Sequence, residues 1–126
     1  MTKDRYQRGC ETMVQLAGEQ GKQALEGVKA FSPAFAQLIA ETFGDIYTRP
    51  VLSLQQRELV TLSSLITQGA DENQLQFHFH AALHAGLTVE ELIEVIMHCT
   101  AYAGFPRALS ALQILQKMLA DKETNR

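Results

Sequence analysis

Hydrophobic residues recur every three or four positions along nearly the whole chain, and the alternation typical of a β-strand is never sustained. Such spacing gathers apolar side chains into one stripe on a helix, which must then pack against another helix. We therefore predict an all-α fold, a compact bundle of about six helices. The helical pattern itself falls into seven segments: residues 5–17, 22–30, 33–43, 54–68, 71–85, 89–99 and 106–119.

The ends of several helices are marked by residues that favour those positions. Ser32 followed by Pro33 predicts the start of a helix. Serine caps the free N–H groups, and proline at the first helical position removes no hydrogen bond of the helix. Gly18 and Gly44 are predicted stops, and Asp71 is a predicted N-cap. Two capping boxes are expected, one at Ser53 with Gln56 and one at Thr88 with Glu91.

Several predicted helices are apolar on more than one face, most clearly at 54–68 and 106–119. Part of this apolar surface is explained most simply by contact with other copies of the chain, so we expect a homo-oligomer. A trimer or a hexamer is the expected assembly, although the apolar faces alone do not set the number of copies. Within 33–43, the apolar residues expected to be buried are Phe35, Leu38, Ile39 and Phe43. The charged end, 121–126, is expected to be disordered.

Length, charge and apolar content limit the number of domains, the kind of partner and the location that we expect. A chain of 126 residues without linker-like segments predicts a single domain over 1–126. Its net charge of −3, with no basic stripe, argues against nucleic acid as a partner. No apolar run is long enough to span a bilayer, and the first residues lack the apolar core of a signal peptide, so we expect no membrane association and a cytoplasmic location.

The stretch LQFHFHAALHAG, residues 75–86, concentrates three histidines in one predicted helix. His80 and His84 are four residues apart and lie on one face, whereas His78 points to a different side. A metal site would need further ligands, such as Glu94 and His98 on the next helix. Because an isolated H-x-x-x-H pattern is weak evidence, we predict no metal; His84 is expected to be solvated.

Longer stretches of the chain carry a family resemblance. The segments RYQRG, GDIYTRPVLSLQQRELVTLSSLI and HFHAALHAGLTVEELIEVIMHCTAYAGFP resemble the carboxymuconolactone decarboxylase family, whose members share an all-helical fold with the alkylhydroperoxidases. The resemblance extends over most of the chain, from about residue 5 to residue 115. It implies an alkylhydroperoxidase-like arrangement of helices.

Within this resemblance, the residues favour the decarboxylase branch over the peroxidase branch. The peroxidases use a C-x-x-C followed by a histidine, but here Asp71 and Gln74 stand at the two cysteine positions before His78. Neither residue can act as a thiolate, so dithiol peroxidase activity is not expected. The resemblance implies a carboxy-lyase that converts 4-carboxymuconolactone to 3-oxoadipate enol-lactone in protocatechuate breakdown, with no cofactor.

The resemblance also implies site residues. It places a catalytic histidine at His78 and a catalytic glutamate at Glu58, on the preceding predicted helix. A lactone carrying carboxylates needs cations with forked donors, for which Arg49 and Arg57 are candidates, with Arg107 as a further one. His80 is a candidate to line the same pocket. Each arginine could equally form a surface salt bridge, and Glu58 could simply pair with an arginine.

Two other functions remain open from the sequence. The first is an antioxidant protein related to the alkylhydroperoxidases that lacks the C-x-x-C and uses Cys99 as a lone peroxidatic thiol, supported by His98. The second is a non-catalytic module of the same fold that binds a small metabolite. Cys99 itself is more simply interpreted as a small apolar filler, and both cysteines, Cys10 and Cys99, as free thiols.

Overall fold

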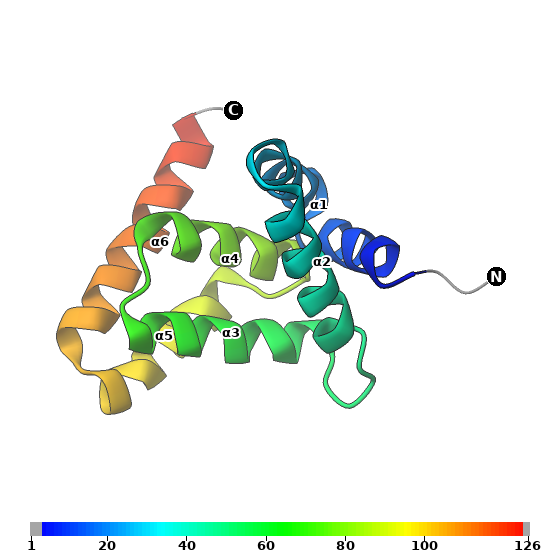
Figure 1. The fold of residues 1–126 in the computed structure, drawn as a ribbon. Helices are drawn as coiled ribbons and strands as arrows, with labels where there is room; N and C mark the ends of the chain where they lie inside the picture. The colour runs from blue at the N-terminus through cyan, green and yellow to red at the C-terminus, as the bar shows by residue number, and fades with distance from the viewer. Residues whose placement is uncertain (1–3, 125–126) are drawn as a thin grey trace. The chain divides into compact units, whose positions relative to one another are not determined.

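The structure is a computed structural model that describes residues 4–124, with side chains as far as residue 122. The described residues form six α-helices and no strand (Figure 1), which confirms the all-α prediction. The helices are α1 (Arg5–Phe31), α2 (Pro33–Tyr47), α3 (Leu54–Gln68), α4 (Glu72–His84), α5 (Val89–Ala103) and α6 (Phe105–Thr124). The chain divides into two compact units, Met1–Arg57 and Glu58–Arg126.

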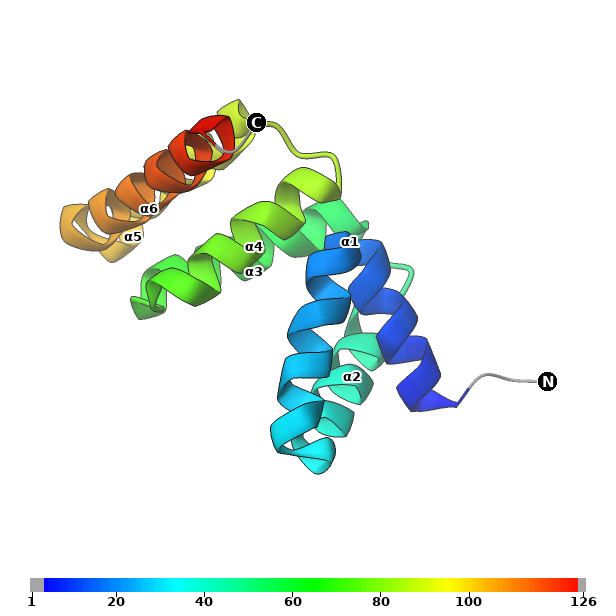
Figure 2. The same cartoon turned by 90° about the horizontal axis from the view of Figure 1, so that it is seen from above.

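In the first unit, α1 is sharply bent at Gly18. This residue has φ 60° and ψ −141°, a conformation that glycine adopts without a steric penalty, and helical geometry resumes directly after it. The predicted stop at Gly18 therefore divides one element into two arms, residues 5–17 and 19–31, which Figure 2 shows meeting at an angle. The two short helices predicted here correspond to these arms.

Helices α1 and α2 approach each other closely through small residues. A Cβ atom built on Gly9 would lie 1.8 Å from the backbone oxygen of Ala40, and one built on Gly44 would lie 2.9 Å from Gly9 Cα. Gly9, Ala40 and Gly44 are all buried. The contact is therefore backbone against backbone, and it leaves no room for any side chain larger than hydrogen at Gly9.

Charged side chains hold the same two helices together at the start of α1. Arg5 Nη2 donates to Asp45 Oδ2 at 2.6 Å, and Arg8 Nη2 donates to Asp45 Oδ1 at 2.7 Å. The hydrogen bond from Arg5, followed by that from Arg8, lowers the pKa of the Asp45 carboxyl. Asp45 is thereby kept ionised between two guanidinium groups.

The limits of α2 were predicted correctly at the start and wrongly at the end. Ser32 Oγ accepts a hydrogen bond from Phe35 N at 3.1 Å, as expected of an N-cap. The helix continues past Gly44 to Tyr47, because Gly44 is buried against α1 inside the helix rather than at its end. The expected burial of Phe35 and Leu38 is also wrong: they are 56% and 59% exposed, and Ile39 and Phe43 are only half-buried.

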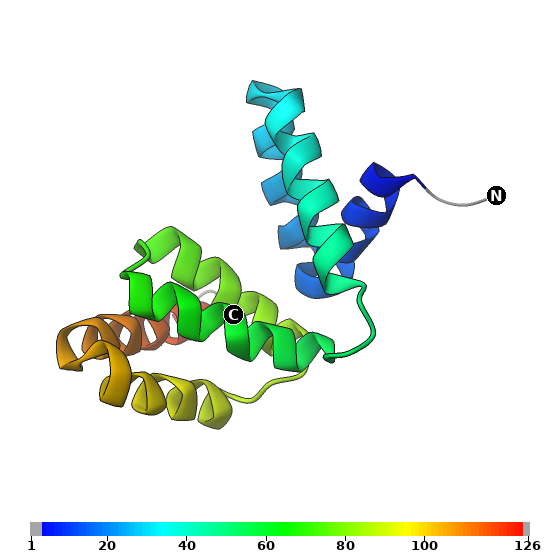
Figure 3. The same cartoon turned by 60° about the horizontal axis from the view of Figure 1, so that its bottom comes forward.

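The second unit has a continuous apolar core contributed by α3, α4, α5 and α6. In Figure 3, α3 lies beside α4, and α5 lies beside α6. The largest fully buried apolar side chains of this core are Leu62, Ile66, Phe79, Leu92 and Leu115, which come from all four helices. Because Phe79 is fully buried, the helix that also carries the histidines is fixed firmly in the core.

The caps of this unit follow the sequence closely. Asp71 Oδ1 accepts from Gln74 N at 2.9 Å at the start of α4, and Thr88 and Glu91 form the predicted capping box at the start of α5. Helix α6 continues to Thr124, so the expectation of disorder from 121 onward is wrong as far as 124. Residues 125–126 lie outside the described residues.

Apolar side chains remain exposed on the second unit. Tyr102 and Phe105 are 81% and 76% exposed, and Met97 and Leu109 are more than half exposed.

Among the described helices, none combines the length and the apolar character that crossing a bilayer requires. The single domain and the homo-oligomer stay predictions.

Candidate active site

Glu58 lies in the second turn of α3 and has no exposure to water. The helix begins after Ser53, whose Oγ accepts from Gln56 N at 3.1 Å while Gln56 Oε1 accepts from Ser53 N, so the predicted capping box is confirmed. Leu62, one turn further on, is in the apolar core. A carboxylate in such surroundings loses its hydration, which is costly unless nearby polar groups compensate.

His78 supplies a polar group from α4. Its side chain is 7% exposed, and its Nδ1 lies 3.5 Å from Glu58 Oε2. The flanking residues explain its position, because Leu75 and Phe79 belong to the core and hold this part of the helix against it. The predicted meeting of the glutamate and the histidine is confirmed, while their catalytic roles stay a prediction.

The geometry of this pair determines which chemistry it can perform. At 3.5 Å the contact is longer than the usual N–H···O hydrogen bond, and a small movement would shorten it into one. A carboxylate at Nδ1 favours the ring orientation in which Nε2 meets a reactant, and it stabilises the imidazolium when the ring gains a proton. The pair can therefore hold and deliver one proton in a site shielded from water.

Phe77 is a neighbour of this pair that the sequence reasoning missed. Its ring meets the His78 ring edge-on, with 5.1 Å between the ring centroids and an angle of 80° between the planes. The alternation FHFH in residues 77–80 is the feature that could have suggested it. An aromatic ring at this position restricts the orientations that the imidazole can adopt.

His80 and His84 lie where helical spacing predicts. Their ring centroids are 6.4 Å apart, so the expected neighbourhood on one face is confirmed. His80 is half-buried, whereas His84 is exposed at the end of α4, in agreement with the expected solvated position. His80 therefore remains a candidate for the pocket lining, and His84 is a suitable control residue.

Arg49 and Arg57 are brought together in the first unit. Arg57 Nη2 donates to the backbone oxygen of Arg49 at 3.1 Å. Arg49 is exposed in the turn after α2, and Arg57 is half-buried in α3. The buried Nε of Arg57 has no hydrogen-bond partner within the described residues, so it retains a donor for an anion.

Arg107, the further arginine candidate, is engaged elsewhere. Its Nη1 donates to the backbone oxygen of Thr67 at 2.6 Å, which satisfies one of the last carbonyl groups of α3. The guanidinium also lies against Gly69, where an added Cβ would meet Nη1 at 2.8 Å. Arg107 therefore stabilises the turn between α3 and α4.

The lone-thiol interpretation finds little support in the surroundings of Cys99. Cys99 is 3% exposed, and burial raises the pKa of its thiol, so the nucleophilic thiolate is disfavoured. His98 is exposed and contacts the Tyr102 ring, with 5.5 Å between centroids.

Within residues 4–124, no three histidine, cysteine or acidic side chains cluster as metal ligands would. His80, His84, Glu94 and His98 therefore do not form the alternative metal site.

Comparisons with known proteins identify a family and several relatives that this chain resembles. The model of the carboxymuconolactone decarboxylase family matches residues 33–117. The chain is 33% identical to 4-carboxymuconolactone decarboxylase of Acinetobacter baylyi, over 93% of this chain and 88% of the relative. It is also 33% identical to nitrosuccinic acid decarboxylase of Metarhizium robertsii, over 84% of this chain and 74% of the relative.

A more distant relative is an uncharacterised protein of Methanocaldococcus jannaschii, which is 25% identical over 79% of this chain and 92% of its own length. The family match includes both Glu58 and His78, the two residues that meet in the buried pair. Together with the all-α fold, these similarities show that the chain belongs to the carboxymuconolactone decarboxylase family.

Proposed function

We propose that this protein is a cofactor-free carboxy-lyase that decarboxylates 4-carboxymuconolactone to 3-oxoadipate enol-lactone. The observation that carries the proposal is the buried pair of Glu58 and His78, with 3.5 Å between Oε2 and Nδ1. A carboxylate and an imidazole held together out of water form a proton-transfer device. The membership of the family and the two decarboxylases among the relatives support the reaction class.

The compounds named for the two relatives have a chemical feature in common. Each is a carboxylic acid with an electron-accepting group, a lactone carbonyl in one and a nitro group in the other. Such a group can receive the electron pair that remains when carbon dioxide leaves. The substrate class is therefore an acid that provides its own electron sink, and the protein needs to supply only binding, shielding and a proton.

The reaction balances without a further reactant. The bond between the ring carbon and its carboxylate breaks, and carbon dioxide departs. The bonding electron pair spreads through the conjugated double bond onto the carbonyl oxygen of the lactone, which gives a dienolate. One proton then adds to carbon and gives the enol-lactone. Stabilising the charge on oxygen and delivering that proton are the two tasks left to the protein.

His78 can perform either task, because an imidazole has one nitrogen that can accept a proton and another that can donate one. As the imidazolium it donates from Nε2 to the developing oxyanion or to carbon, and the Glu58 carboxylate at Nδ1 stabilises its charge. The burial of both groups strengthens these interactions, because little water is present to screen them.

The substrate carboxylates require cationic partners, and we assign this role to Arg49 and Arg57. Their mutual contact through Arg57 Nη2 restricts the Arg57 side chain, and its unbonded Nε remains available for a carboxylate oxygen. His80, half-buried on α4, is assigned to the lining of the substrate pocket. These assignments predict a weaker KM effect for Arg49→Lys than for Arg49→Ala, because lysine keeps the charge but loses the fork.

The decisive experiment measures the ultraviolet absorbance of 4-carboxymuconolactone with the purified protein and with two histidine variants. His78→Ala should lower kcat by about 10²-fold or more, because it removes the proton donor. The matched control is His84→Ala, which removes an exposed imidazole from the same helix and should leave turnover unchanged. Circular dichroism should show the same helicity for all three proteins.

A third variant, Glu58→Gln, tests the pair itself. Glutamine keeps the size of the buried side chain but cannot carry the negative charge, so kcat should fall and its pH profile should shift. Full activity of His78→Ala would contradict the proposal. If the wild-type protein converts nitrosuccinate but only binds the lactone, the lactone is not its substrate. If it binds the lactone or nitrosuccinate and converts neither, it is a metabolite-binding module.

A further inference from the structure

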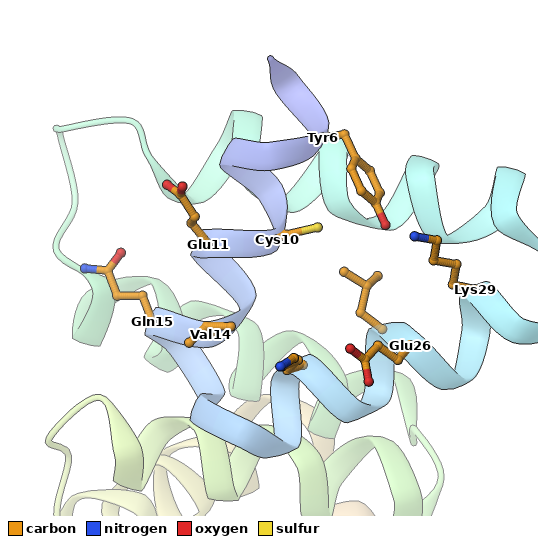
Figure 4. Close-up of a pocket in the computed structure, with 9 residues that line it drawn as sticks. Tyr6, Cys10, Glu11, Val14, Gln15, Glu26 and Lys29 are labelled. Atoms are coloured by element: carbon orange, nitrogen blue, oxygen red, sulfur yellow. The ribbon is translucent and has the colours of Figure 1, made fainter. Parts of the chain in front are cut away.

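The first unit has a groove, and none of the residues assigned to decarboxylation lines it. It is formed by the two arms of α1 on either side of the bend at Gly18 and encloses about 590 Å³, within the range usual for small-ligand sites. Its lining is mainly apolar. Figure 4 shows Cys10 and Tyr6 on the first arm facing Glu26 and Lys29 on the second.

One end of the groove combines a hydroxyl group with a cation. In Figure 4 the Tyr6 hydroxyl and the Lys29 ammonium point toward each other, and Lys29 Nζ lies 5.7 Å from the centroid of the Tyr6 ring. Within residues 4–124, Lys29 has no ion pair with a carboxylate. A neutral hydroxyl donor beside an unneutralised ammonium is a favourable environment for a carboxylate.

The state of the tyrosine agrees with this interpretation. A hydrogen bond with Cys10 raises the pKa of Tyr6, and burial adds to this effect, while Lys29 acts in the opposite direction. At neutral pH the phenol is therefore protonated, and an anion beside Lys29 would replace the Cys10 sulfur as the acceptor of its hydrogen. Cys10 lies in the same groove and is half-buried, so its thiol can report on occupancy.

The rest of the groove determines the shape and charge of the ligand. Val14 and the buried Leu25 form an apolar surface that suits a flat or aliphatic body. Two carboxylates, Glu11 and Glu26, also line the groove. Once a ligand carboxylate occupies Lys29, they outnumber the one remaining cation, Lys22, and disfavour a second negative charge. A ligand with one carboxylate and an apolar body therefore fits better than a dicarboxylate.

We propose that the groove between the two arms of α1 is a second ligand site, which binds a small apolar monocarboxylate with its carboxylate at Tyr6 and Lys29. The proposal is independent of the decarboxylation, because none of Glu58, His78, Arg49 or Arg57 lines the groove. Its test likewise uses binding rather than activity.

Benzoate is a suitable probe, with benzamide as its neutral counterpart and phthalate as the dianion. Titration calorimetry should give a Kd for benzoate on the order of 0.1–1 mM, which is typical of so small a ligand. Benzamide and phthalate should each bind at least about tenfold more weakly, because one lacks the charge and the other meets Glu26. Benzoate should also slow the alkylation of Cys10 by iodoacetamide, while the buried Cys99 stays unreactive.

The variants locate the carboxylate. Lys29→Gln should abolish the preference for benzoate over benzamide, and Lys29→Arg should retain it. The matched control is Lys22→Gln, which makes the same change of charge in the same groove. Equal binding of benzoate and benzamide, or a greater effect of Lys22→Gln than of Lys29→Gln, would overturn the proposal. So would ligand-free protection of Cys10 that disappears on dilution, since a second copy of the chain would then fill the groove.

Discussion

Two individual carboxylates of this protein have their negative charge compensated in opposite surroundings. Glu58 is fully buried and has the His78 imidazole as its neighbour, whereas Asp45 is on the surface and lies between two guanidinium groups. An exposed ion pair contributes little, because water and salt screen it. A buried pair depends strongly on both partners, since removing one leaves the other desolvated and unpaired.

Asp45 makes the acid response of the α1–α2 contact predictable. Its pKa is lowered by the hydrogen bonds from Arg5 and Arg8, so its contribution to stability is present above the pKa of the unfolded chain. This contribution is lost as the pH falls through the lower pKa of the folded protein. Asp45→Asn should therefore lower the melting temperature slightly at pH 7, and the difference from wild type should vanish in strong acid.

Thermal unfolding at several pH values, in low and high salt, measures this difference. Asp121→Asn is the control, because Asp121 is an exposed carboxylate of the other unit that accepts no arginine hydrogen bond within the described residues. A difference between Asp45→Asn and wild type that persists unchanged at pH 2 would show that charge is not the cause.

Among the helices, glycine residues determine how closely the first arm of α1 packs against α2. Gly9 meets the Ala40 backbone so closely that a methyl group cannot be accommodated, whereas Gly27, in the second arm of the same helix, has nothing within 4 Å of the position of an added Cβ. The same residue type therefore has two different roles within one helix.

This contrast provides a matched pair of substitutions. Gly9→Ala should destabilise the protein by about 1–3 kcal/mol, because the two helices must move apart. Gly27→Ala should stabilise it by about 0.5–1 kcal/mol, because alanine favours the helix and nothing opposes it. Urea unfolding followed by circular dichroism measures both, and equal effects of the two substitutions would show that the close contact does not govern stability.

At the scale of the whole molecule, the exposed apolar side chains of α5 and α6 favour self-association. We expect Met97, Tyr102, Phe105 and Leu109 to be covered by another copy of the chain, because leaving them in water costs roughly 25 cal/mol per Å². Light scattering after size exclusion should then give three or six times the chain mass of 14.0 kDa.

A single charge tests which face is involved. Leu109→Lys should lower the mass of the assembly, whereas Gln113→Lys, one turn further along α6 and also exposed, should alter it less. A monomeric wild-type protein would contradict the expected oligomer. An assembly unchanged by Leu109→Lys would place the interface on another surface.

Local features of the sequence were sufficient to predict where α2, α4 and α5 begin. Ser32, Asp71 and Thr88 each cap a helix as expected, because capping involves only atoms within three residues of the cap. Periodicity was likewise sufficient for the all-α class. It was not sufficient for burial, since Phe35 and Leu38 were expected to be buried and are exposed.

The all-α class, most helix caps and the absence of a C-x-x-C followed from the sequence alone, because each depends on residues that are close together along the chain. The contact between Glu58 and His78, twenty positions apart, was expected only from the family resemblance. Tertiary structure decided that contact, the bend at Gly18 and the continuation of α2 through Gly44. The reason is physical: whether a glycine ends a helix, bends it or admits another backbone depends on what packs against it, and that partner is remote in sequence.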